Sequence, residues 1–398
     1  SNVRSLGNSG RVLAYLWQGS LASRRESGKS LSVLDPEQEY QELCENLGGC
    51  YLAYRSGEYV INPLQPQNWD EDPVNEDDER TPEQRDAAPM SRSSIGESGN
   101  LAPAPQSPVV PVPGPFQKTT MLSRHISYLK DFFRSYKDFT TAQLDTIELM
   151  LQKLYRRFDM DDYTDFSQAA PEKFPTMSDF YDLLEEESDM YDAKKKNLFS
   201  EEPSQEVCLG LHSMCKGAES NYFNGHTNIK DDKFLVFGVK GIMELNRSLR
   251  DALLFSILSY MTNALLRAGN YVGALDELYL FLTNLTAIEY IRNLMKRDRK
   301  KDSLLVLASQ NIEDFLQPGV RELTKPLFSI PTHQFLFNPG QLEPKAFCAT
   351  LQLEQAEFEL IRYPERGTCL YRCGNERYLL QVHFPEFKEA MFGKAGGR

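Results

Sequence analysis

Residues 270–282, which read N-Y-V-G-A-L-D-E-L-Y-L-F-L, are the stretch that decides the fold. A short apolar run follows Gly269-Asn270 and ends on two adjacent carboxylates, Asp276 and Glu277. A run of this length, bounded by turn residues, is typical of a strand buried on both faces of a mostly parallel sheet. Taken alone, the dipeptide also fits a strand that simply ends in a polar turn.

The neighbouring sequence repeats an alternation of strands and helices. Short apolar runs predict strands, and longer amphipathic runs predict helices. In chain order, strands are expected at 234–239, before Asp276 and at 304–310, and helices at 245–268 and 284–295. This alternation indicates an α/β fold, with a mostly parallel sheet covered by helices on both faces.

Such sheets carry their working residues at the carboxyl ends of the strands. An aspartate in the position of Asp276 can hold Mg²⁺, directly or through water, and a neighbouring glutamate such as Glu277 can polarise an attacking water. A pair of this kind is the acidic signature of P-loop NTPases.

Composition narrows the class of protein. The 398 residues carry a net charge of -13, which argues against wholesale binding to nucleic acid or anionic lipid. No apolar run approaches the ~20 residues of a transmembrane helix. Seven cysteines without framework spacing indicate a reducing compartment. The sequence starts without a methionine and looks truncated at its N-terminus.

Two glycine-bearing segments compete for the role of a phosphate loop, which needs G-x-x-x-x-G-K-[ST] at the start of a helix. Gly7-Asn8-Ser9-Gly10 follows a possible strand, but Arg11-Val12 replaces the lysine and the hydroxyl residue. Gly28-Lys29-Ser30 supplies those letters but precedes a predicted strand that ends at Asp35. We interpret Gly28-Lys29-Ser30 as a turn and keep nucleotide binding there as the alternative.

The chain divides into four expected parts: residues 1–64 and 201–398 form the two halves of the α/β core, 65–115 an acidic and proline-rich disordered linker, and 116–200 an all-helical insertion. In the first half we expect a helix from Pro36 to Leu47 and strands at 51–54 and 59–61. In the insertion, Thr140 to Gln143 has the pattern of a capping box. Near the end, Gly374-Asn375 joins two strands in a hairpin.

Residues 292–301 carry six basic side chains, among them Arg299 and Lys300. The end of a helix with such a run is usually a solvated face that suits the helix dipole. The functional alternative is a cation presented to the nucleotide of a neighbouring subunit. Contact with nucleic acid is less favoured, since no stacking aromatic residues are interleaved with these charges.

Several motifs in this order and spacing resemble the ATPase domain of the VirB-type conjugal-transfer ATPases of type IV secretion systems. They are Asp35-Pro36-Glu37-Gln38-Glu39-Tyr40, Ile61-Asn62-Pro63-Leu64, Phe223-Asn224-Gly225-His226-Thr227-Asn228, Leu275-Asp276-Glu277, Arg299-Lys300 and Ser309-Gln310-Asn311. The resemblance covers nearly the whole chain except the linker.

The resemblance implies a RecA-like ATPase core that binds ATP and Mg²⁺ and couples hydrolysis to assembly or to passage of DNA or protein. It implies a homo-hexamer without transmembrane segments, in the cytoplasm, at the inner face of the membrane, with other secretion components as partners and DNA as a further candidate. By the same resemblance, Asp276 would hold Mg²⁺, Glu277 would orient the water, Gln310 would sense the γ-phosphate, and Arg299 or Lys300 would act between subunits. Residues Gly7, Asn8, Ser9, Gly10 and Asp35 would face the nucleotide.

The chain departs from the family at the phosphate loop, where the lysine is missing or displaced, and it lacks the family's N-terminal domain. Catalysis of phosphoryl transfer is mostly positioning and charge stabilisation, so crippled hydrolysis is expected. Two alternatives to a working ATPase therefore stay open: a catalytically crippled structural subunit of the same machine, and a DNA-pumping coupling ATPase.

Overall fold

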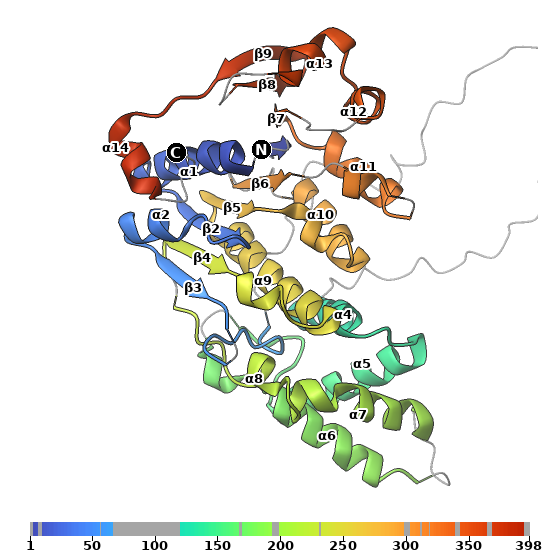
Figure 1. The fold of residues 1–398 in the computed structure, drawn as a ribbon. Coiled ribbons are helices and arrows are strands. Elements are labelled where there is room, and N and C mark those ends of the chain that lie inside the picture. Colours follow the sequence, from blue (N-terminus) through green and yellow to red (C-terminus); the bar gives the residue numbers. More distant parts are fainter. Residues whose placement is uncertain are drawn as a thin grey trace, which may run out of the picture.

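The computed structural model describes residues 3–6, 10–55, 57–66, 120–166, 169–192, 199–230, 232–297, 303–310, 313–317, 319–338, 343–363 and 368–393. The expected linker lies outside these residues, apart from Gln65 and Pro66. The described strands form one nine-stranded sheet in the order β3-β4-β2-β5-β6-β1-β7-β8-β9 (Figure 1). The strands are β1 (Val3–Leu6), β2 (Ser30–Asp35), β3 (Cys50–Ala53), β4 (Phe234–Gly238), β5 (Tyr271–Leu275), β6 (Leu304–Ser309), β7 (His333–Leu336), β8 (Thr368–Cys373) and β9 (Glu376–Gln381).

The strands from β3 to β7 in this order pair in parallel, and the β8–β9 hairpin adds two antiparallel pairs at one edge. The central strands β4, β5 and β6 are buried along their whole length. This is the pattern of parallel strands covered on both faces, and the predicted α/β class is confirmed. The strand predicted from the run before Asp276 is β5.

Side chains of each central strand alternate between two hydrophobic clusters, as the period of a strand requires. In β6, Leu304, Val306 and Ala308 join the cluster on one face. Leu305 and Leu307 join the cluster on the other face. A shift of one residue in the pairing of β6 would exchange these sets, so the two cores together hold the register.

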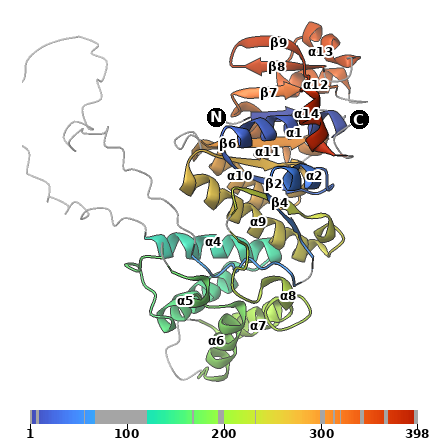
Figure 2. The ribbon, with the colours of Figure 1, turned by 90° about the vertical axis from the view of Figure 1, so that its left-hand side faces the viewer.

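Different helices cover the two faces of the sheet (Figures 1 and 2). One cluster contains side chains of α1 (Gly10–Glu26) and α2 (Gln41–Asn46). The other contains side chains of α9 (Arg247–Ala268) and α10 (Leu285–Arg297). The remaining elements of this half are α11 (Arg321–Ser329), α12 (Pro344–Leu351), α13 (Gln355–Arg362), α14 (Glu386–Glu389), η2 (Lys240–Ile242), η3 (Leu278–Phe281), η5 (Glu313–Leu316) and η6 (Ala390–Phe392).

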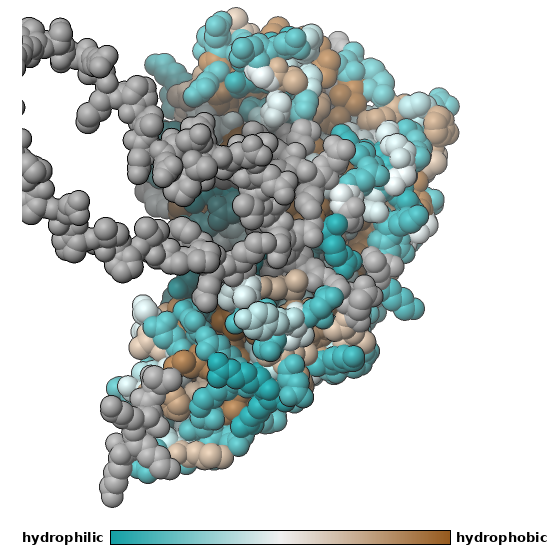
Figure 3. All heavy atoms as spheres, turned by 180° about the vertical axis from the view of Figure 1, so that it is seen from behind, coloured by the Kyte–Doolittle hydropathy of each residue, from teal (hydrophilic) through white to brown (hydrophobic). Residues whose placement is uncertain are grey.

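A group of helices lies between β3 and β4 in the chain and at the far end of the molecule from the β8–β9 hairpin in both views (Figures 1 and 2). It consists of α4 (Met121–Tyr136), α5 (Thr141–Arg157), η1 (Pro171–Lys173), α6 (Met177–Asp189), α7 (Glu201–Cys215) and α8 (Ser220–Phe223). Its apolar stripes share a core with α9. Seen from behind, the visible surface of this group is mostly hydrophilic, as expected when the stripes point inward (Figure 3). The group extends beyond residue 200, because α7 packs against α5 and α6.

Two of the quoted motifs meet at the joint between the sheet and this helical group. The amide of Val60 donates to Asn228 Oδ1 at 2.8 Å, and the amide of Asn62 donates to Thr227 Oγ1 at 3.0 Å. On the other side, Asn62 Nδ2 donates to the carbonyl of Pro175 at 2.9 Å. The Asn62 and Asn228 motifs therefore tie the chain together, with no part in the carboxyl edge of the sheet.

Two local expectations from the sequence are wrong. The helix expected from Pro36 begins only at Gln41, because the Asp35 carboxylate accepts the amides of Glu39 and Tyr40 and holds the preceding residues in a turn. The strand expected at 59–61 is absent from the described residues, since side chains rather than a neighbouring strand satisfy that backbone.

The C-terminal segment folds back across α1 (Figure 1). The amide of Phe384 donates to Tyr15 Oη at 3.1 Å, and Lys388 Nζ pairs with Glu26 at 2.9 Å. Gly19 makes this approach feasible, because a Cβ on it would lie 2.2 Å from the ring of Phe384. Among the described helices, none is both long enough and apolar enough to cross a membrane.

The predicted capping box at the start of α5 is confirmed, and it can be tested. Gln143 N donates to Thr140 Oγ1 at 3.3 Å, and Thr140 N donates to Gln143 Oε1 at 2.7 Å. We expect Thr140→Ala to lower the free energy of unfolding by about 1 kcal/mol, since it leaves helix amides unsatisfied. Thr141→Ala, at the next exposed position, is the control and should change it by less than about 0.5 kcal/mol. Equal effects in denaturant titrations would contradict the assignment.

Candidate functional site at the carboxyl edge of the sheet

The carboxyl ends of three neighbouring strands bring the sequence-predicted acids and amide together. Asp35 ends β2, Asp276 and Glu277 follow β5, and Gln310 follows β6. The register pairs Leu34 with Leu275 and Leu275 with Leu307, so these side chains leave the sheet at one level. The next strand in the sheet is β1, whose last residue pairs with Ser309.

Asp35 is a fully buried carboxylate held by the backbone of its own turn. It accepts the amide of Glu39 at 3.0 Å and the amide of Tyr40 at 3.1 Å. Burial raises the pKa of Asp35 to about 6, although the hydrogen bonds from these amides act in the opposite direction. The carboxylate thus fixes the loop that carries Tyr40 toward β5.

Tyr40 connects this turn to the acid that follows β5. Its side chain is 1% exposed, and its hydroxyl hydrogen bonds with Asp276. The amide of Asp276 donates to the carbonyl of Leu34 at 3.4 Å, which continues the β2–β5 ladder by one residue. Burial, followed by the charges of Glu277 and Glu39, raises the pKa of Asp276 well above its ordinary value. Asp276 is therefore a half-buried carboxylate in a fixed position, among like charges.

Glu277 has a strained backbone and a side chain that is only 4% exposed. Its φ of 58° and ψ of 60° lie in the left-handed region, which costs a non-glycine residue about 1–2 kcal/mol. The side chain reaches sideways to β6, where Gln310 N donates to Glu277 Oε2 at 3.5 Å. Burial raises the pKa of Glu277 to about 7 despite the contact with Gln310. Strain of this kind persists where the surrounding structure requires one direction of the side chain.

The carboxylates of this edge lack a cationic partner in the described part of the chain. None of Asp35, Asp276 and Glu277 forms an ion pair there. Uncompensated carboxylate oxygens are the ligands that a hard divalent cation prefers. Mg²⁺ is commonly held by one or two carboxylates together with water and substrate oxygens. The described residues contain no group of three metal-ligating side chains.

The candidate phosphate loop lies mostly outside the described residues. Gly7, Asn8 and Ser9 are not described, and Gly10 is the first residue of α1. The strand β1 ends at Leu6 and α1 begins at Gly10, so this helix starts at the carboxyl edge, where β1 lies next to β6. This order points the free amides of a helix N-terminus at the edge. Arg299 and Lys300 also lie outside the described residues.

The alternative phosphate loop, Gly28-Lys29-Ser30, lies at the amino edge of the sheet, away from the acids. Gly28, with a φ of +84°, forms the turn between α1 and β2, and Lys29 Nζ donates to Asn270 Oδ1 at 2.7 Å. Ser30 is the first residue of β2, so the turn enters a strand instead of opening a helix. The length of β2 separates it from Asp35 by roughly 16 Å.

Sequence reasoning missed two residues of this edge. Tyr40 stood in a quoted motif, yet nothing in the spacing showed that its hydroxyl reaches Asp276. Gly238 ends β4, and a Cβ there would lie 2.2 Å from the hydroxyl of Tyr51. The ring of Tyr51 thus covers the end of β4. Asp35 lies beside it, because Asp35 pairs with Gly238 in the sheet.

Comparisons with known proteins find a similar fold in two solved proteins, VirB4 and TrwB. No family model matches the chain, and no curated protein matches it. Among solved structures, VirB4 of Thermoanaerobacter pseudethanolicus is 24% identical with a TM-score of 0.77, over 97% of this chain and 90% of that chain. The coupling protein TrwB is 11% identical with a TM-score of 0.51 in its sulphate complex, over 95% of this chain and 84% of that one. With a non-hydrolysable ATP analogue, TrwB is 11% identical with a TM-score of 0.52, over 97% of this chain and 86% of that one.

These likenesses confirm, at the level of the fold, the resemblance to VirB-type ATPases that the motifs carried. The chain has a mostly parallel α/β core with the fold of VirB4.

Because the pKa of Glu277 is raised, the free energy of unfolding should depend on pH through this residue. Below the ordinary pKa of 4.5 the side chain is protonated in both states, and above about 7 it is charged in both. Between these values only the unfolded state loses the proton, so the contribution of Glu277 to stability falls as pH rises. Without nucleotide or Mg²⁺, we expect Glu277→Gln to gain about 2 kcal/mol of unfolding free energy relative to wild type between pH 5 and pH 8. The exposed control Glu313→Gln should show a flat difference, and a flat difference for Glu277→Gln would refute the assignment.

Proposed function

We propose that this chain is the ATPase domain of a conjugative-transfer or type IV secretion machine. In that role it couples ATP hydrolysis to assembly of the machine or to translocation of DNA or protein. The observation that carries the proposal is the pair Asp276 and Glu277 at the end of β5, beside Asp35 and Gln310, in a sheet with the fold of VirB4. A relative in fold, TrwB, has been solved with an ATP analogue.

In the proposed reaction, Asp276 would hold Mg²⁺, directly or through water, with Tyr40 fixing the carboxylate. When bound, the metal would neutralise charge on the triphosphate. Asp35 takes part through its turn, because its buried carboxylate positions Tyr40. Gly7, Asn8, Ser9 and Gly10 would offer backbone amides to the phosphates at the start of α1.

Glu277 is proposed as the group that orients and polarises the attacking water. A carboxylate with a pKa near 7 is matched to accepting a proton at physiological pH. Gln310, whose amide touches Glu277, would sense the γ-phosphate from the end of β6. Arg299 or Lys300 would complete the charge stabilisation from a neighbouring subunit in a homo-hexamer.

The absence of a phosphate-loop lysine limits the expected rate. Without that cation, the transferring phosphoryl group has one electrostatic contact fewer. We therefore propose slow turnover, and this same observation supports the second candidate, a structural subunit that keeps the fold and the partners but not the hydrolysis. In either case the protein would act in the cytoplasm against the inner face of the membrane, with other secretion components as partners.

The first test is turnover. We expect Glu277→Gln to abolish phosphate release while leaving the affinity for labelled ATP with Mg²⁺ within about threefold of wild type, since orienting a water matters in the transition state alone. Glu313→Gln, an exposed acid in η5, should leave both unchanged. Undetectable ATP binding by the wild-type chain would discard the ATPase proposal and leave the structural subunit. Unchanged turnover in Glu277→Gln would show that another group orients the water.

The second test concerns Tyr40 as a positioning residue. We expect Tyr40→Phe to raise the Mg²⁺ concentration needed for half-maximal ATP binding by about tenfold, because the partner that orients the Asp276 carboxylate is lost. Tyr136→Phe is the matched control, since it removes a hydroxyl that donates to Glu219 at 2.5 Å in the helical group. Both variants should lose similar stability, but only Tyr40→Phe should change the Mg²⁺ dependence. The same shift in both would rule out a specific role for Tyr40.

A further inference from the structure

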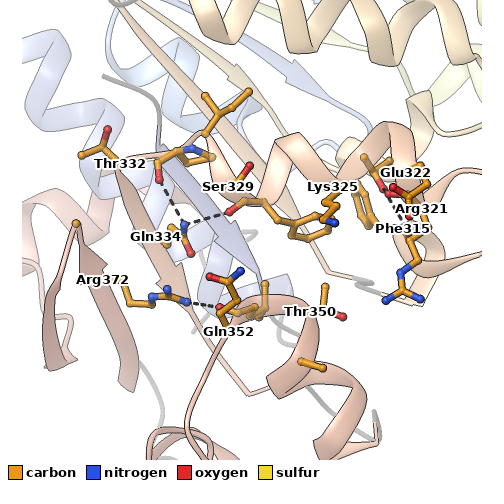
Figure 4. A pocket seen from close by; sticks show the side chains of 17 residues that line it. Phe315, Arg321, Glu322, Lys325, Ser329, Thr332, Gln334, Thr350, Gln352 and Arg372 are labelled. Carbon is orange, nitrogen blue, oxygen red and sulfur yellow. Dashed lines mark hydrogen bonds between the residues drawn. The ribbon is translucent and has the colours of Figure 1, made fainter. Parts of the chain in front are cut away.

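A cavity of about 680 Å³ lies between α11, the start of β7 and the end of β8, and its lining contains none of the acids of the carboxyl edge. Its walls come from α11, from the start of β7, from the end of α12 and from the end of β8 (Figure 4). Thr332 and Gln334 stand at the amino end of β7, whereas Asp276 and Gln310 follow the carboxyl ends of β5 and β6. The cavity is therefore separate from the proposed nucleotide site.

Among the charged side chains of the lining, cations outnumber acids. Arg321 and Lys325 lie one turn apart on α11, Arg372 comes from β8, and Glu322 is the one acid in the lining. Within the described residues, none of the three cations forms an ion pair. Three positive charges against one negative leave the pocket with a net positive lining in a chain whose net charge is -13.

Arg372 lines this cavity and leaves part of its hydrogen-bonding capacity unused. Its Nη1 donates to the carbonyl of Leu351 and fixes the guanidinium against the end of α12 (Figure 4). Its Nε is buried and has no hydrogen-bond partner among the described residues. Burial, together with the nearby Arg377, lowers the pKa of Arg372. The Nε–Nη2 edge of an arginine binds the oxygens of a phosphate or carboxylate in a bidentate manner.

Neutral hydrogen-bonding groups complete the walls. Ser329, Thr332 and Thr350 bring hydroxyl groups to the lining. Gln352, the C-cap of α12, has a left-handed backbone with a φ of 53° and stands beside Arg372 in the pocket (Figure 4). The hydroxyls of Ser329 and Thr350 donate to the carbonyls of Pro326 at 3.4 Å and of Ala346 at 2.8 Å, so their oxygens line the pocket while their protons are in use. Thr332 and Gln352 bring further polar groups that can donate to an oxyanion once its water is removed.

We propose that this pocket binds the phosphate group of a small phosphorylated molecule. A phosphate carries more charge than a single carboxylate and uses more donors, which matches the three cations Arg321, Lys325 and Arg372. The volume is within the range of small-molecule sites, about 300–1,000 Å³. A walled pocket of this size favours a compact ligand over a nucleic-acid strand, which needs an extended groove with stacking aromatic side chains.

The test uses inorganic pyrophosphate as the probe, titrated calorimetrically into the full chain in metal-free buffer. We expect binding at one site, weakened about tenfold or more by Lys325→Gln and by Arg372→Lys, which keeps the charge but loses the fork. Lys345→Gln, on α12 but outside the lining, is the charge-matched control and should change the affinity less than twofold. Thermal unfolding of each variant shows that the fold is retained.

Three results would overturn the proposal. Equal affinity in wild type, Lys325→Gln and Arg372→Lys would place the bound pyrophosphate elsewhere, as at the start of α1. An equal loss in Lys345→Gln would show a general effect of surface charge. Failure to bind pyrophosphate, with tight binding of a single-stranded oligonucleotide or of an acidic peptide, would assign the pocket to a macromolecule.

Discussion

The buried Asp35 carboxylate is the contact on which the carboxyl edge depends. It accepts two backbone amides of its own turn, and the second of these belongs to Tyr40. Through Tyr40 the same turn reaches Asp276 on the neighbouring strand. A buried carboxylate without those amides would bear the full cost of desolvation, so the turn and the charge stabilise each other. One acid thus sets the position of another across two strands.

The carboxyl edge lowers the stability of the chain when no ligand is bound. Burial raises the pKa of Asp35 to about 6 and that of Glu277 to about 7. The charged form of each carboxylate is therefore less stable in the folded chain than in water. Glu277 adds a left-handed backbone to this cost. Such a concentration of unfavourable terms at the ends of two neighbouring strands has no use in packing alone. It becomes reasonable when a cation and a phosphate chain are expected to occupy the edge, because a ligand that binds the folded state offsets the cost by mass action.

The sequence predicts the central strands and helices of this fold well, because a strand covered on both faces must be an uninterrupted apolar run. It also places Asp276, Glu277 and Gln310 at one edge, since parallel strands share their carboxyl ends. It fails where a side chain competes with the backbone. The Asp35 carboxylate takes the amides of a turn that Pro36 seemed to open as a helix, and Asn228 replaces a strand partner for the segment around Val60. The link from Tyr40 to Asp276 is a tertiary contact, and no local pattern encodes it.

The two ends of the strands carry charges of opposite sign, and the sign at each end determines which ligands it can bind. At the carboxyl edge the acids repel phosphate, so a triphosphate can approach only with a divalent cation and with the helix amides at the start of α1. At the amino edge of β7 the cations Arg321, Lys325 and Arg372 accept an oxyanion directly. The net charge of -13 does not forbid this, because charges beyond about 8–10 Å are screened in physiological salt. Short-range geometry, with an arginine fork already fixed on Leu351, therefore decides the affinity of that pocket more than the charge of the whole protein.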